Sequence, residues 1–132
     1  ILCLLSKEDG LFQITDCRQI RHTLSNSNDT ESVRKFQFML KKLFEDYKVK
    51  KVAIRERPTK GKFAGGSVGF KIEAAIQLID TVQVDLFSGA KSKDILQYNP
   101  MPIPFKATGL RAFQEGAFTT AYVALSEHMT EA

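Results

Sequence analysis

The sequence is poor in the residues that hold small folds together through covalent bonds or metals. Among 132 residues there are two cysteines, two histidines and no tryptophan. Cys3 and Cys17 do not form a Cys-x-x-Cys pair, and His22 and His128 are far apart, which argues against a structural zinc site. Two cysteines in a domain able to bury its own core are typical of reduced thiols, so the sequence predicts a cytoplasmic protein.

Long apolar segments are also absent. No apolar run approaches the roughly 18 residues that cross a bilayer, so we expect no membrane association. The apolar opening Ile1–Leu5 is too short for a signal peptide and has no basic residues before it. Because strands rarely begin so abruptly, we expect further residues before Ile1 in the full protein. The length fits a single domain covering residues 1–132.

What the sequence does contain is an uneven distribution of positive charge. The net charge is +4, yet the segment from Lys48 to Lys71 holds eight basic side chains and one acid, Glu56. A concentrated positive field attracts phosphates, so nucleic acid is a candidate partner, with a solubilising lysine-rich face as the alternative. The basic residues that we expect to contact phosphates are Arg55, Arg57, Lys60, Lys62 and Lys71.

Hydrophobic periodicity predicts strands first, followed by alternating helices and strands, which indicates an α/β fold with crossover connections. Residues 7–10 are expected to form a hairpin turn, and the third strand an edge strand that holds His22. An exposed edge of this kind permits a homodimer. The expected strands cover residues 1–6, 11–15, 18–24, 51–57 and 82–87, and the expected helices after the first cover about 66–80, 92–97 and 108–127.

The first helix is the clearest feature of the pattern. Its start can be capped by Asn28, with Glu31 three residues later, or by Asp29 itself. One apolar stripe at three- and four-residue spacing contains Val33, Phe36, Met39, Leu40, Leu43, Phe44 and Tyr47. Four aromatic residues fall at helical spacing, and we interpret them as core residues rather than base-stacking platforms: Phe36, Phe38, Phe44 and Tyr47.

Two acids are candidates for catalysis and metal binding. Glu56 follows the apolar strand centre 52–54, and the carboxyl end of a parallel strand lies on the rim where α/β sheets bind ligands. Such an acid can hold Mg²⁺ or Mn²⁺, while a surface pair with a neighbouring arginine is the alternative. Glu115 lies in an apolar final helix, where an acid needs a partner or a ligand. Glu73 is expected to be solvent-exposed beside Lys71.

The glycine-rich loop 60–67 does not complete a nucleotide-binding motif. Gly61 and Gly66 have the spacing of P-loop glycines, but Ser67 and Val68 stand where that motif requires Lys and Ser or Thr. The loop is therefore interpreted as a basic loop beside a site or as a flexible connector. Phosphate or nucleotide binding by a regulatory protein remains a third hypothesis.

Two sets of residues carry a family resemblance. The stretches 47–57, 68–79 and 82–87 resemble the middle of RuvC-type Holliday-junction resolvases. Almost the whole chain is similar to a family of uncharacterised bacterial proteins assigned to the ribonuclease-H-like superfamily. The segments 16–19, 61–66 and 113–115 carry that closer similarity. The resemblance implies a mixed sheet flanked by helices, with antiparallel strands first and then alternating helix and strand.

The resemblance also implies a set of metal-binding acids. In that superfamily the first strand, the glutamate after the fourth strand and the last helix each supply one acid. Glu56 matches the second position, and Glu115 matches the third within about a turn. The first acid would precede Ile1. The expected activity is therefore magnesium-dependent phosphodiester cleavage of nucleic acid, and the alternative is a non-catalytic binding or scaffold module on the same fold.

Overall fold

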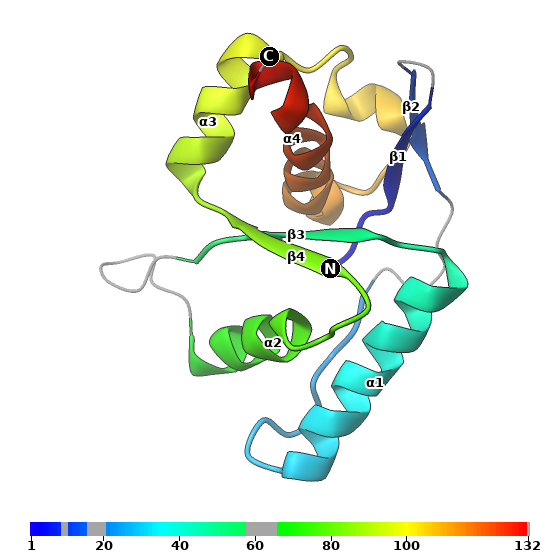
Figure 1. Cartoon of the computed structure of the whole chain (residues 1–132), viewed down its shortest axis with the longest axis vertical. Coiled ribbons are helices and arrows are strands. Elements are labelled where there is room, and N and C mark those ends of the chain that lie inside the picture. The colour runs from blue at the N-terminus through cyan, green and yellow to red at the C-terminus, as the bar shows by residue number, and fades with distance from the viewer. Residues whose placement is uncertain (9–10, 16–20, 58–65, 132) are drawn as a thin grey trace. The chain divides into compact units, whose positions relative to one another are not determined.

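The computed structural model describes residues 1–8, 11–15, 21–57 and 66–131. These residues form a mixed α/β structure with four α-helices, two short 3₁₀ helices and two two-stranded sheets (Figure 1). They group into two units. Unit 1 joins residues 1–21 to 87–132, and unit 2 is the intervening segment 22–86. The single domain expected from the sequence stays a prediction.

The order of elements agrees with the predicted succession of strands followed by alternating helices and strands. Within the described ranges, no helix is long and apolar enough to cross a membrane. The elements are β1 (Leu5–Glu8), β2 (Leu11–Ile14), α1 (Thr30–Asp46), β3 (Lys51–Arg55), α2 (Ser67–Gln77), β4 (Gln83–Phe87), α3 (Gly89–Tyr98), the 3₁₀ helices Phe105–Thr108 and Ala112–Gln114, and α4 (Glu115–Glu131).

In unit 2, α1 begins at a side-chain cap. The Asp29 carboxylate accepts hydrogen bonds from the backbone N–H and the hydroxyl of Ser32, at 3.2 and 2.8 Å. Asp29, not Asn28, is therefore the residue that caps the helix and satisfies one of its free N–H groups. The buried face of α1 consists of Phe36, Leu40, Leu43 and Phe44.

Three residues expected in the core of α1 are instead exposed. Phe38 is 65% exposed, Met39 48% and Tyr47 38%. At about 100° per residue, Phe38 lies on the side of α1 opposite the buried stripe. Its spacing from the other aromatic residues therefore did not show whether it faces the core or the solvent. The interpretation of Phe36 and Phe44 as core residues is confirmed, and that of Phe38 and Tyr47 is wrong.

Unit 2 continues with a strand–helix–strand element in which β3 pairs in parallel with β4. After α1, Lys48 adopts a left-handed conformation with φ of 55°, and its N–H donates to the Glu45 carbonyl. This turn leads the chain from the helix into β3. The Gln37 amide nitrogen donates to the Ala75 carbonyl at 2.8 Å, which joins α1 to α2, and both helices lie on the same side of the strand pair in Figure 1.

Unit 1 is built around α4, which contacts α3 and the antiparallel hairpin of β1 and β2. Tyr122 on α4 links several of these segments. Its ring lies 5.0 Å from that of Phe12 in the hairpin. Its hydroxyl lies 3.0 and 2.9 Å from the carbonyl oxygens of Asn99 and Pro100. α4 therefore holds both the hairpin and the proline-rich segment that follows α3.

The N-terminal strands differ from those expected. The strand predicted over residues 1–6 starts only at Leu5 and includes Lys7 and Glu8, which were assigned to the turn. The strand predicted over residues 18–24 lies partly outside the described residues, and its described part, 21–24, has no regular structure. His22 is thus half-buried in an irregular segment rather than exposed on an edge strand. Polar–apolar alternation over a few residues is not sufficient for a strand without a pairing partner.

The described strands form two pairs, and the single mixed sheet that the resemblance implies stays a prediction. β1 pairs with β2, and β3 pairs with β4, each as a two-stranded sheet in the part of the chain that the structure describes. β3 therefore has a hydrogen-bonded neighbour on one side only, and is not an interior strand among these residues. The coarser α/β class is the one that the structure shows.

Candidate functional site

Glu56 lies just beyond the carboxyl end of β3, whereas the strand was expected to continue to residue 57. The strand ends at Arg55, and Glu56 and Arg57 continue the chain beyond its carboxyl end. All three side chains are exposed. The Glu56 carboxylate, between two arginines in the sequence and just beyond the end of a parallel strand, is thus accessible to a divalent cation, and the arginines are accessible to phosphate.

Arg57 lies against α2 at a glycine. A Cβ atom placed on Gly69 would come within 3.0 Å of the Cζ, Nε and Nη1 atoms of Arg57. The missing side chain at position 69 therefore leaves room for the guanidinium group on the first turns of α2. Sequence reasoning did not find this contact, because twelve residues separate the two positions.

Glu73 lies on the same face of α2 as Gly69, four residues later. We expected its carboxylate in solvent, but Glu73 is half-buried and its Oε2 atom is buried with no hydrogen-bond partner among the described residues. Burial of an unpaired carboxylate oxygen is costly. This face of α2 therefore holds an acid with one buried carboxylate oxygen that has no hydrogen-bond partner among the described residues.

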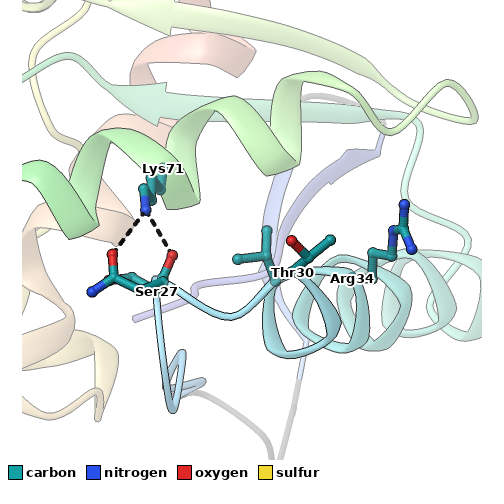
Figure 2. A pocket seen from close by; sticks show the side chains of 6 residues that line it. Ser27, Thr30, Arg34 and Lys71 are labelled. Atoms are coloured by element: carbon teal, nitrogen blue, oxygen red, sulfur yellow. Dashed lines mark hydrogen bonds between the residues drawn. The ribbon is translucent and has the colours of Figure 1, made fainter.

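Lys71 takes part in an internal contact on another face of α2. Its ammonium group donates to the Ser27 carbonyl at 2.7 Å and lies 3.4 Å from Asn28 Oδ1, so it fastens the loop before α1 (Figure 2). A depression of about 310 Å³ opens beside this contact. A phosphate contact through Lys71 stays a prediction. The depression is lined by Ser27, Asn28, Thr30, Val33, Arg34 and Lys71.

Glu115 does not occupy the buried position that the sequence indicated. It is exposed at the first residue of α4, where an acid is favoured by the positive end of the helix dipole. The buried neighbour is Gln114, 5% exposed, whose side chain accepts from the Arg111 N–H and donates to the Leu2 carbonyl. Gln114 thus holds the N-terminal segment against the start of α4, a role that sequence reasoning missed.

The predicted site residues fall in both units. Glu56, Arg55, Arg57 and Lys71 belong to unit 2, and Glu115 belongs to unit 1, so neither unit alone holds both candidate metal-binding acids. Within residues 1–8, 11–15, 21–57 and 66–131, no group of three or more His, Cys, Asp or Glu side chains is placed to hold a metal ion. The predicted phosphate contacts Lys60 and Lys62 lie outside the described residues.

The excess positive charge of the chain belongs entirely to unit 2. Residues 22–86 contain twelve lysines and arginines against eight acids, whereas unit 1 contains seven of each. The net charge of +4 is therefore that of one unit. A phosphate-rich partner would be attracted to unit 2 rather than to the chain as a whole.

The Cys3 thiol is a weak nucleophile at neutral pH. Burial raises the pKa of its thiol to about 11, because the thiolate would be poorly solvated. The thiol therefore stays protonated at neutral pH.

We expect Cys3 to react slowly with alkylating reagents. With Cys17 replaced by serine, iodoacetamide should modify Cys3 about a hundredfold more slowly at neutral pH than a free thiol of the ordinary pKa, because the thiolate fraction is smaller. The rate should rise through an inflection near pH 11. An inflection at the pH of a free thiol, measured by mass spectrometry of the folded protein, would show that the burial does not control the thiol.

The fold and these side chains define the chain as a mixed α/β protein with a basic strand–helix–strand unit. Over residues 1–124 it matches the family described as a protein of unknown function, DUF3010, and it belongs to that family. No curated protein and no solved structure matches it. Because the function of this family is unknown, a functional hypothesis must rest on the arrangement of the residues themselves.

Proposed function

We propose that the chain is a ribonuclease-H-like domain that binds nucleic acid and cleaves phosphodiesters with a divalent cation, Mg²⁺ or Mn²⁺. The observation that carries the proposal is the exposed Glu56 between two exposed arginines at the carboxyl end of β3, within the unit that holds the whole net positive charge. The succession of a hairpin and then alternating helices and strands supports the fold assignment.

The acidic and the basic residues of the proposed site would have different roles, binding of the cation and binding of phosphate. Glu56 would supply a carboxylate ligand to the cation. Carboxylate oxygens are the ligands that Mg²⁺ prefers in proteins. A bound cation would stabilise the negative charge that develops on the phosphate. Arg55 and Arg57 can pair with phosphate oxygens through two parallel N–H groups, and Lys60, Lys62 and Lys71 would add contacts that do not depend on base sequence.

A non-catalytic nucleic-acid-binding or scaffold module is the second candidate. It is favoured by the exposure of both Glu56 and Glu115, because metal-binding carboxylates are usually held in place by further hydrogen bonds. This candidate predicts salt-sensitive binding with no cleavage at any divalent cation concentration. The cytoplasmic location and a homodimer remain predictions under either function.

A cleavage assay on the complete gene product separates the two candidates. Labelled single-stranded and double-stranded DNA and RNA are incubated with Mg²⁺, with Mn²⁺ or with EDTA. The proposal expects products with either cation and none with EDTA. Binding without products under all conditions would contradict the catalytic function and support the binding module.

A further inference from the structure

The outward face of α1 presents an aromatic ring to solvent. Phe38 is 65% exposed, and Met39 beside it is 48% exposed. The opposite face of the same helix supplies the buried residues Phe36, Leu40, Leu43 and Phe44. α1 therefore already has its packing face, and the ring of Phe38 is not needed to close the core of unit 2.

Basic side chains surround this ring. On a helix, the neighbours of a residue on the same face stand three and four positions away in each direction. For Phe38, all four of these positions are basic, and two of the four, Lys35 and Lys42, form no ion pair within the described residues. The four neighbours are Arg34, Lys35, Lys41 and Lys42.

The ion pairs that the other two neighbours make are weak. Arg34 lies 3.8 Å from Glu31, and both side chains are largely exposed. Lys41 lies 3.8 Å from Asp80, whose side chain is 87% exposed. Exposed pairs of this length are readily exchanged for a phosphate, so all four cations are available to an anionic ligand.

We propose that the outward face of α1 binds single-stranded nucleic acid, with a base stacked on Phe38 and the neighbouring phosphates held by the four basic residues. An exposed ring offers a flat surface to any base, and flanking cations track the backbone on both sides of it. Arg34 to Lys42 spans roughly 12 Å of helix, which is enough for more than one phosphate.

The chemistry of this face favours a single strand over other anionic partners. In a duplex the faces of the bases are covered by their neighbours, so a lone ring has nothing to stack on. A membrane-binding helix inserts a wide apolar face into the lipid, whereas the wide apolar face of α1 is buried in unit 2. One ring and one methionine among four cations give little area for insertion.

The inference deepens the proposed function by naming a ligand class, and it concerns a surface on α1 rather than the end of β3. It requires neither a metal nor Glu56. The two proposals can therefore fail separately, since one concerns cleavage and the other concerns affinity without cleavage.

The test is fluorescence anisotropy of the complete protein in EDTA with an oligothymidylate of about fifteen nucleotides, a length that covers a typical single-strand site. Phe38→Leu keeps an apolar side chain and removes the ring. We expect it to weaken binding about tenfold or more, and Phe38→Trp to restore binding, because stacking depends on an aromatic face. Lys35→Gln with Lys42→Gln should lower the slope of log affinity against log salt by about 1.4.

Tyr98→Leu is the matched control. Tyr98 is 68% exposed on α3, so the change removes an equally exposed ring from another helix, and wild-type affinity is expected. Circular dichroism melting curves check that each variant folds.

Equal affinities for Phe38→Leu and wild type would overturn the inference and leave the cleavage proposal standing. So would equal losses in Phe38→Leu and Tyr98→Leu. Binding that depends on Phe38 but occurs only with a duplex, with anionic lipid vesicles or with polyglutamate would also overturn it. A wild-type protein that binds neither single-stranded nor double-stranded nucleic acid would remove both proposals.

Discussion

Glu56→Gln is expected to reduce magnesium-dependent cleavage at least about a hundredfold while nucleic-acid binding is kept. Glutamine preserves the size of the side chain and removes its negative charge, so the site would lose one anionic ligand of the cation. A bound cation contributes several kcal/mol of charge stabilisation to the transition state. Because about 1.4 kcal/mol corresponds to a tenfold change in rate, losing part of this stabilisation accounts for a hundredfold reduction. Initial rates at saturating Mg²⁺ measure the effect.

Glu45→Gln is the matched control for this variant. Glu45 is an exposed acid of the same unit, located in the last turn of α1, and it has no place in the proposed site. Both substitutions change the net charge equally and should leave the melting temperature unchanged. Undiminished cleavage by Glu56→Gln, or an equal loss in Glu45→Gln, would contradict a metal-binding role for Glu56.

Tyr122→Ala is expected to cost about 3–5 kcal/mol of folding free energy, the usual range for removing a buried aromatic side chain. Tyr122 is 5% exposed, and its ring and hydroxyl bind the hairpin and the segment after α3 to α4. Tyr122→Phe keeps the ring and leaves two carbonyl groups without this donor, so it should cost about 1–3 kcal/mol. Urea denaturation of both variants measures the contributions of the ring and of the hydroxyl group to the free energy of unfolding.

The control for this prediction is Tyr98→Ala, which removes an exposed ring from α3. It should change stability by no more than about 0.5 kcal/mol, since little burial is lost. A similar loss in Tyr98→Ala and Tyr122→Ala would mean that Tyr122 does not link the elements of unit 1 as described.

The helices and the later strands could be predicted from the sequence because each has a strong local pattern. The stripe containing Phe36 and Leu40 defined α1, and Asp29 was one of two capping residues considered. The apolar centre of β3, residues 52–54, indicated where Glu56 would lie. These features depend on residues within a few positions of one another, and that is the range over which periodicity and capping operate.

Whether a helical residue faces the core or the solvent was harder to predict. The pattern placed Phe38 and Tyr47 in the core because they are aromatic and helically spaced, yet the packing of unit 2 uses a narrower face of α1. For a related reason, Glu73 was expected to be exposed and is half-buried, whereas Glu115 was expected in an apolar helix and is exposed. The first turn of α4 faces solvent at Glu115, and the middle of α2 is covered at Glu73.

Contacts between distant residues account for the rest of the candidate site. The position of Arg57 over Gly69, the bond from Lys71 to Ser27 and the bond from Gln114 to Leu2 each join different elements. None leaves a local pattern in the sequence. Only Gly69 offered a sign, since a glycine inside a helix often marks a close approach by another group.

The salt dependence of nucleic-acid binding tests the central claim most directly, namely that unit 2 meets the phosphate backbone. Affinity for a duplex is measured over a range of salt for the double variant Lys50→Gln, Arg55→Gln and for the control Lys93→Gln, Lys106→Gln. All four side chains are exposed, and only the first pair belongs to unit 2. We predict that the first variant lowers the slope of log affinity against log salt by about 1.8, and that the control keeps the wild-type slope. Equal slopes for the two variants would contradict the claim.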